Sequence, residues 1–158
     1  MKRKSVLLLV SILFISLLAG CDSNNNLAID DWQVNLISYE TTNWIDSDIS
    51  GYGYSPDEDY EWLLINLEIT NLKKEGQSIN WILDDFNLIT EYENTYTLKL
   101  AYNDPPGYID TSYNPQQIKE GFIVFEVPIR TNISKCKLLW DPYEGNKTTF
   151  YLDNLTEQ

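Results

Sequence analysis

Hydrophobic and polar residues alternate with a period of two along most of residues 31–158, which is the period of a β-strand with one buried face. The segment 60–71 is the clearest case, because its apolar residues share one face: Leu63, Ile65, Leu67 and Ile69. Shorter alternating segments follow the same rule: 32–36, 86–88, 96–100, 136–140 and 148–152. The segment 122–127 is apolar on both faces except at Glu126, which predicts a central strand covered on both sides.

Gly, Pro, Asn and Asp cluster between these segments, at 73–77, 103–107 and 141–146, where they predict turns. No stretch shows the period of an amphipathic helix. About seven or eight short antiparallel strands separated by such turns predict an all-β fold, a β-sandwich. Two longer connections, 41–59 and 102–116, are where we expect any binding site, because long loops in compact domains are commonly functional.

The first twenty residues carry a different pattern, typical of an export signal. Three basic residues at 2–4 precede an apolar run at 6–18, which is short for a membrane-spanning helix. The run ends in Leu18-Ala19-Gly20-Cys21, which resembles the lipobox of bacterial lipoproteins. The resemblance implies cleavage before Cys21 and attachment of a diacylglycerol, with acyl chains such as palmitate, to its thiol. The alternative is an ordinary secretory signal or an uncleaved anchor with a chance cysteine.

These features divide the chain into three parts. Residues 1–20 are predicted to be a lipoprotein signal peptide, and residues 21–30 a lipidated N-terminus with a short, polar, flexible tether. The sandwich is predicted over residues 31–158, which is enough for one domain with its own core.

The net charge narrows the classes of partner. The whole chain carries −13, and removal of residues 1–20 takes away three of eleven basic residues and no acid, which leaves −16. A domain of this charge repels phosphate backbones, so nucleic-acid binding is excluded. Basic attraction to anionic lipids is also excluded, so the predicted membrane attachment depends on Cys21 alone. The absence of histidine excludes Ser-His-Asp, Cys-His and His-ligated zinc sites.

Three segments together resemble the DUF4352 domain, an immunoglobulin-like, telokin-like module of bacterial exported proteins and lipoproteins. The segment 60–71 closes on Thr-Asn, 85–90 contains Asp-Phe-Asn-Leu, and 120–128 reads Glu-Gly-Phe-Ile-Val-Phe-Glu-Val-Pro. The resemblance covers about residues 31–152 and implies an immunoglobulin-like antiparallel β-sandwich. It implies no activity, cofactor or catalytic residue. The chain departs from the family in the turn 91–94, which lacks the usual glycine, and in the length of the connection 41–59.

The segment 46–57 follows the layout of a calcium-binding EF-hand loop. Asp46, Asp48 and Ser50 supply oxygens at alternate positions, Gly51 follows, and Asp57 ends the segment. Three features oppose a calcium site: the last ligand is Asp rather than Glu, a glycine replaces the expected aliphatic residue, and neither flank is helical. The simpler interpretation is a solvated acidic loop. Paired carboxylates of a hydrolase are a further alternative, although no feature selects one pair.

Aromatic residues are frequent in the two long connections: Trp44, Tyr52, Tyr54, Tyr102, Tyr108 and Tyr113. Such side chains bind glycans or peptides well, but the favoured interpretation is that they anchor their own loops. The remaining tryptophans are expected in the core or on sheet faces: Trp32, Trp62, Trp81 and Trp140. Cys136 shares a face with Leu138 and Trp140, so we expect a buried, unreactive thiol.

The sequence therefore predicts a non-catalytic lipoprotein anchored to the cell membrane through Cys21, on the extracytoplasmic face. Its sandwich is expected to act as a binding module for an unidentified protein, peptide or glycan. No catalytic residue, metal ligand or cofactor site is predicted. The alternatives are a calcium-dependent surface module using the segment 46–57 and, less favoured, a carboxylate-based hydrolase.

Overall fold

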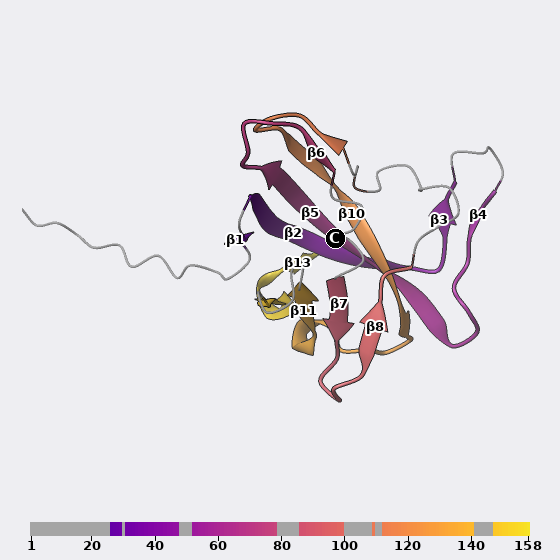
Figure 1. Cartoon of the computed structure of the whole chain (residues 1–158). Helices are drawn as coiled ribbons and strands as arrows, with labels where there is room; N and C mark the ends of the chain where they lie inside the picture. The colour runs from indigo at the N-terminus through magenta and orange to yellow at the C-terminus, as the bar shows by residue number, and fades with distance from the viewer. Residues whose placement is uncertain are drawn as a thin grey trace, which may run out of the picture.

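Two β-sheets pack face to face in the computed structural model, which describes residues 26–29, 31–47, 52–78, 86–99, 109, 112–140 and 147–158 (Figure 1). Within these residues the larger sheet has five strands: β1 (Asn26–Ile29), β2 (Trp32–Thr42), β5 (Tyr60–Asn71), β10 (Ile118–Pro128) and β13 (Thr156–Glu157). Their order is β1-β2-β5-β10. β1 and β13 pair with β2 on either side of a bulge between Leu36 and Ser38.

The smaller sheet has four strands in the described part of the chain: β12 (Thr148–Tyr151), β11 (Lys137–Trp140), β7 (Phe86–Ile89) and β8 (Thr95–Thr97), in that order. Two short ladders complete the structure: β3 (Ile45–Asp46) with β4 (Gly53–Tyr54), and β6 (Gln77–Ser78) with β9 (Ser112–Tyr113). The 3₁₀ turns η1 (Ile133–Lys135) and η2 (Leu152–Asn154) lie at the ends of β11 and β12.

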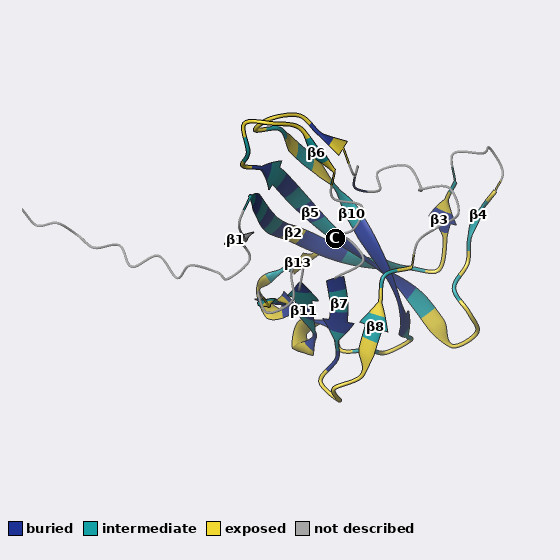
Figure 2. Ribbon diagram, in the orientation of Figure 1, coloured by how far each residue is buried: buried dark blue, intermediate teal, exposed yellow. Residues whose placement is uncertain are grey.

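The main core lies between the two sheets, as the alternation predicts (Figure 2). Alternate residues over 63–69 of β5 and 123–127 of β10 point into it, and the smaller sheet supplies its own buried set: Phe86, Leu88, Leu138, Trp140 and Phe150. The rings of Phe86 and Trp140 stack with their centroids 5.3 Å apart. A second, smaller cluster lies on the outer face of the larger sheet: Ile45, Trp62, Leu64 and Val124. The β3–β4 hairpin covers this outer cluster.

β10 is covered on both faces, as the segment 122–127 predicts, but it is not a central strand. Its position is last in the strand order of the larger sheet, counted over the described residues. On its outer edge, the Val124 carbonyl accepts the backbone N–H of Lys99 at 3.0 Å. The Phe122 carbonyl accepts the backbone N–H of Ile109, also at 3.0 Å. The chain therefore leaves the smaller sheet after β8 and contacts the edge of β10. A run of apolar residues predicts that both faces of a strand are buried, but it does not predict which neighbours pair with its edges.

The side chain of Asn71 joins three segments at one end of the sandwich. Its Nδ2 donates to the carbonyls of Glu75 at 2.8 Å and Asn114 at 3.0 Å. Its Oδ1 accepts from the backbone N–H of Lys73 at 2.9 Å and from Nε2 of Gln77 at 2.6 Å. Asn71 is fully buried, so these four bonds satisfy a group that would otherwise destabilise the core.

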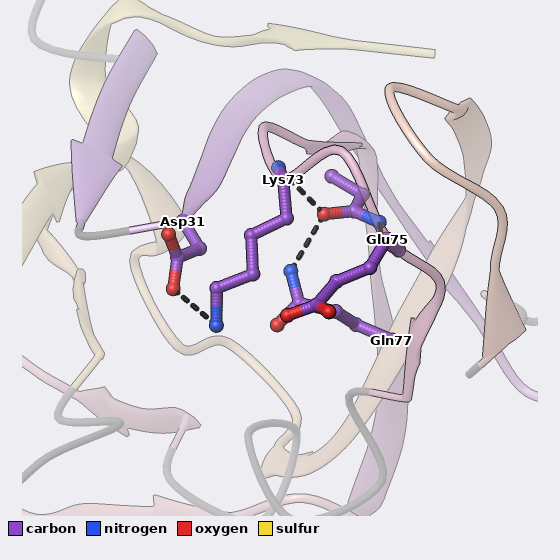
Figure 3. Close-up of polar contacts among 5 residues, drawn as sticks. Asp31, Lys73, Glu75 and Gln77 are labelled. Carbon is purple, nitrogen blue, oxygen red and sulfur yellow. Dashed lines mark hydrogen bonds and ion pairs between the residues drawn. The ribbon is translucent and has the colours of Figure 1, made fainter.

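An ion pair lies beside this network. The Nζ of Lys73 lies 2.6 Å from the Asp31 carboxylate. Figure 3 shows this ion pair beside Glu75 and Gln77. Asp31 immediately precedes β2, and Lys73 follows β5, so the pair links the ends of two neighbouring strands. Both side chains are partly exposed, so the pair contributes little to stability beyond positioning the turn.

The predicted β-sandwich is confirmed. The sheet begins before residue 31, because β1 lies within the segment 21–30 that was predicted as a tether. Residues 1–25, including the predicted lipid attachment residue Cys21, lie outside the described residues, as does Trp81. Within the described part, no helix has the length and apolar character needed to cross a membrane.

Candidate functional site

The connection 41–59 forms a hairpin rather than an open loop. Asp46 pairs with Gly53 across the β3–β4 ladder. The Trp44 indole lies against Gly53, and its Nε1 donates to Asp46 Oδ1 at 2.8 Å. Glycine is required at position 53 because a side-chain carbon there would overlap the indole. The hairpin is joined to β5 by Trp62, whose Nε1 donates to the Tyr54 carbonyl at 3.0 Å.

The aromatic residues of the long connections have divided roles. Tyr54 packs against the outer cluster, and Tyr113 is buried with its ring edge-on to Trp32, centroids 5.3 Å apart. These two tyrosines anchor their segments, as the favoured interpretation predicts. Tyr52 is 69% exposed and Trp44 is half exposed, so both present aromatic surface to solvent. Tyr102 and Tyr108 lie outside the described residues.

Two acidic residues of the segment 46–57 lie within the described residues, Asp46 and Asp57, and they have different hydrogen-bond partners. Asp46 is engaged with Trp44 within the hairpin, whereas the backbone N–H of Asp57 donates to Glu126 on β10 at 2.8 Å. Asp48, Ser50 and Gly51 lie outside the described residues. No group of three or more potential metal-ligating side chains occurs in the part of the chain that the structure describes.

Glu126 is a buried carboxylate on the outer face of β10. Its Oε2 lies 2.8 Å from Lys99 Nζ, and its Oε1 accepts the Asp57 N–H. Burial alone would raise the pKa of Glu126, but the hydrogen bonds from Lys99 and Asp57 and the Lys99 charge together lower it. Glu126 is therefore ionised and fully engaged, and its role is to attach the segment before Tyr60 and the segment after β8 to the larger sheet.

A cleft of about 240 Å³ opens between two turns that are far apart in the sequence. One wall is formed by residues 90–96, the turn between β7 and β8, and the other by residues 128–132, the turn that follows β10. We call this hollow the turn cleft. Its lining combines two tyrosines, charges of both signs, asparagines and threonines. A small set of polar groups around aromatic and apolar surface is typical of a ligand-binding site.

Both walls are tight turns with charged residues in the left-handed backbone region. In the first wall the Glu93 N–H donates to the Thr90 carbonyl at 3.0 Å, and Glu93 has φ 60°. In the second wall the Thr131 N–H donates to the Pro128 carbonyl at 3.1 Å, and Arg130 has φ 77°. Glycine is the residue usually found at such positions. The first of these turns is the one whose missing glycine distinguishes the chain from the DUF4352 pattern.

The sequence did not predict the turn cleft as a site. Its strongest local signal was that missing glycine, together with the aromatic Tyr92 in the same turn, which is 79% exposed. No local signal linked this turn to residues 128–132, because only the packing of the two sheets brings the two walls together.

Cys136 lies near the second wall, as a buried free thiol. Its Sγ donates weakly to the Asn132 carbonyl at 3.5 Å. Burial, with a smaller contribution from the negative charge of Glu91, raises the pKa of the thiol to about 11. The thiolate required for nucleophilic chemistry is therefore scarce at neutral pH, and the predicted burial of Cys136 is confirmed.

Comparison with solved structures shows the same sandwich in several bacterial proteins. An uncharacterized β-sandwich protein from Clostridium difficile has a TM-score of 0.57 at 14% identity, covering 82% of this chain and 90% of that one. A candidate lipoprotein from Bacillus subtilis has a TM-score of 0.56 at 18% identity, covering 82% of this chain and 38% of that one. A secreted protein from Mycobacterium tuberculosis has a TM-score of 0.55 at 11% identity, covering 82% and 93%. At these identities the similarity establishes the fold alone.

No curated protein matches the chain. The family model for DUF4352, a domain of unknown function, matches residues 24–148, which is most of the chain and includes the described strands from β1 to β11. The resemblance inferred from the segments 60–71, 85–90 and 120–128 is therefore confirmed, and the chain belongs to the DUF4352 family.

Proposed function

We propose that the mature chain is a lipid-anchored, non-catalytic binding module on the extracytoplasmic face of the cell membrane. A diacylglycerol on Cys21 holds the sandwich at the bilayer surface, and the turn cleft binds the ligand. The net charge of −16 keeps the module soluble and disfavours anionic macromolecular partners.

The turn cleft is the observation on which this proposal depends most. Its two walls are presented by turns on a rigid two-sheet scaffold, an arrangement that binding proteins commonly use. Both walls are fixed by backbone hydrogen bonds, so little ordering is required when a ligand binds. A secreted protein and a candidate lipoprotein among the proteins of similar fold support a location outside the cytoplasm.

Cell fractionation of the Cys21→Ser variant tests the anchor. We expect the wild-type chain to appear in the membrane fraction and to incorporate radiolabelled palmitate. The variant is expected to remain unlabelled and to lose membrane association after the signal is removed. A variant that still sediments with membranes would show that something other than the lipid holds the protein there.

A pull-down with the mature wild-type chain tests the binding role. The matched bait carries Tyr92→Ala, which removes the most exposed aromatic side chain of the turn cleft. Material retained by the wild type and lost with Tyr92→Ala would support the cleft as the binding surface. Equal retention by both baits would contradict it.

The calcium-dependent alternative is tested independently by thermal unfolding. Millimolar calcium would raise the Tm if the segment 46–57 binds the ion in the folded state. We expect no change, since Asp46 already accepts from Trp44 and the described residues contain no group of three or more potential metal-ligating side chains. Magnesium at the same concentration controls for general effects of divalent ions.

A further inference from the structure

The turn cleft carries a more specific inference, which concerns the chemical class of its ligand. This inference rests on the proposed function, because it names what the same cleft binds. The cleft volume of about 240 Å³ is below the range of ~300–1,000 Å³ typical of drug-sized ligands, so the cleft has room for a single ring-sized residue.

The charges that line the turn cleft favour a neutral ligand. Glu91 lies on one wall and Arg130 on the other, and neither forms an ion pair within the described residues. An anionic ligand would meet the Glu91 carboxylate and a strongly acidic protein, whereas a cationic ligand would meet the Arg130 guanidinium. A neutral ligand with both donors and acceptors avoids both repulsions.

The hydrogen-bonding groups fit a polyhydroxylated ring. The Glu91 carboxylate only accepts hydrogen bonds, the Arg130 guanidinium only donates them, and the Asn94 amide does both. Adjacent hydroxyl groups on a sugar ring each donate and accept, and the planar ends of these three side chains can contact two neighbouring hydroxyls at once.

Aromatic surface is available for the apolar face of such a ring. Tyr92 is 79% exposed, and Tyr96 on the same wall is partly buried. A tyrosine ring buries area at low entropic cost, because only two side-chain torsions become fixed on binding. Ile129, 49% exposed on the opposite wall, adds further apolar contact.

Thr90 lines the turn cleft, but its hydroxyl is buried rather than open to the cleft. It is the one buried residue among those lining the cleft, 6% exposed, and its hydroxyl has no hydrogen-bond partner among the described residues. A ligand in the cleft is therefore not expected to bond Thr90, and the exposed polar side chains Glu91, Arg130 and Asn94 supply its hydrogen bonds.

We propose that the turn cleft binds one ring of a neutral saccharide. Tyr92 and Ile129 contact the faces of the ring, and Glu91, Arg130 and Asn94 bond its hydroxyl groups. The ligand is identified only as a class: an uncharged sugar, free or at the end of a chain.

Two-dimensional amide NMR spectra of the mature chain, residues 21–158 with Cys21→Ser, test the proposal, since this chain contains every described strand. The probes are three uncharged trisaccharides at millimolar concentration (of glucose with α-linkages, of glucose with β-linkages, and of N-acetylglucosamine). A trisaccharide of galacturonic acid serves as the charged probe, and an uncharged capped tripeptide as the peptide probe. The expected result is a saturable shift of the amide signals of residues 90–96 and 128–132 with at least one uncharged saccharide.

Two variants and a matched control complete the test. Tyr92→Ala and Arg130→Gly are each expected to weaken binding by about tenfold. Arg130→Gly keeps the fold, because glycine is favoured at φ 77°. Gln116→Gly is the control: it removes an exposed side chain at another left-handed position, φ 56°, and Gln116 belongs to neither wall of the turn cleft. Its binding is expected to match that of the wild type.

The outcomes separate this inference from the proposed function. Shifts of the cleft amides with the peptide or the charged saccharide, but not with the uncharged ones, would overturn the saccharide and leave the binding module intact. Saccharide-induced shifts confined to other residues would also overturn it. If no probe shifts the cleft amides, the saccharide proposal fails, and equal retention by the two pull-down baits would then overturn the proposed function as well.

Discussion

Glu126 Oε2 lies 2.8 Å from Lys99 Nζ, although 92% of the Glu126 side chain is buried and about half of the Lys99 side chain is exposed. The pair connects two segments that belong to different parts of the sandwich: β10 of the larger sheet and the chain that has just left β8. The same carboxylate also accepts the Asp57 N–H, so three segments meet at one buried charge. A buried carboxylate is stable only when its partners are present, which makes Glu126 a sensitive test of this side of the fold.

Replacement of Glu126 by Gln should lower the free energy of unfolding by about 1.5–3 kcal/mol, the range found for hydrogen bonds to charged groups. Urea denaturation at neutral pH measures the change. Glu120→Gln is the matched control, because Glu120 is an exposed carboxylate on the same strand, and no measurable loss is expected there.

The effect of Glu126→Gln should depend on pH. The pKa of Glu126 is lowered by folding, so its stabilisation is complete above the ordinary value of 4.5 and is lost as the pH falls through the lower folded value. The difference in unfolding free energy between the wild type and Glu126→Gln should therefore narrow below pH 4.5. A difference that stays constant in acid would contradict the ion pair as its source.

Asn71→Asp should destabilise the sandwich strongly. Aspartate cannot donate to the Glu75 and Asn114 carbonyls, and its charge would repel both of them. We expect a loss of at least about 2 kcal/mol, because a charge is placed at a fully buried position and two part-buried acceptors lose their donor. Asn35→Asp, a partly buried position on β2, controls for the added charge and should have a much smaller effect on the Tm.

Gly53→Ala should disturb the β3–β4 hairpin. A methyl group there would overlap the Trp44 indole and lie 2.6 Å from the Ile45 carbonyl oxygen. Overpacking of this kind destabilises by about 1–3 kcal/mol, and the emission of Trp44 should change because its indole must move. Gly76→Ala is the comparison, since its added carbon would approach only the Tyr113 carbonyl, at 3.3 Å, and a smaller loss is expected.

The thiol of Cys136 should resist modification in the folded protein and react on unfolding. Its pKa is raised by burial from 9.0 to about 11, so the thiolate is scarce even in mild alkali. Reaction with a chromogenic disulfide reagent, with and without urea, measures this protection. Rapid labelling of the native chain would show that the thiol is accessible.

The same pKa shift predicts a loss of stability in alkali. Between pH 9.0 and about 11 the unfolded thiol releases its proton while the folded thiol keeps it, so the free energy of unfolding falls as the pH rises. The contribution reaches roughly 3 kcal/mol at most. Folding also raises the pKa values of Tyr39, Tyr96 and Lys99. The Cys136 contribution is therefore measured as the difference in unfolding free energy between the wild type and Cys136→Ala, which should narrow as the pH rises.

Much of the candidate site could not be predicted from the sequence. The sequence directed attention to the connections 41–59 and 102–116, and the first contributes the exposed Trp44 and Tyr52. The turn cleft instead uses two short turns that no length criterion selects. The absence of glycine at Glu93 was visible in the sequence, but its left-handed backbone and its closeness to the second wall were not.

The order of residues along the chain was enough to predict the all-β class, the buried faces of the main strands and the burial of residues such as Leu63, Phe125 and Cys136. It could do so because the alternation that sets which face is buried is a local property, repeated every two residues along each strand. The predicted anchor at Cys21 also depends on local sequence alone.

Only the folded domain shows the strand order, the edge position of β10 and the partners of Glu126 and Asn71. The physical reason is that these contacts join residues distant in the chain: Asp57 and Glu126 are 69 residues apart, and Asn71 and Asn114 are 43 apart. Alternation fixes which face of a strand is buried, but strand neighbours are chosen by packing of the complete sandwich. The turn cleft likewise depends on contacts between distant parts of the chain, since its two walls meet only after both sheets have assembled.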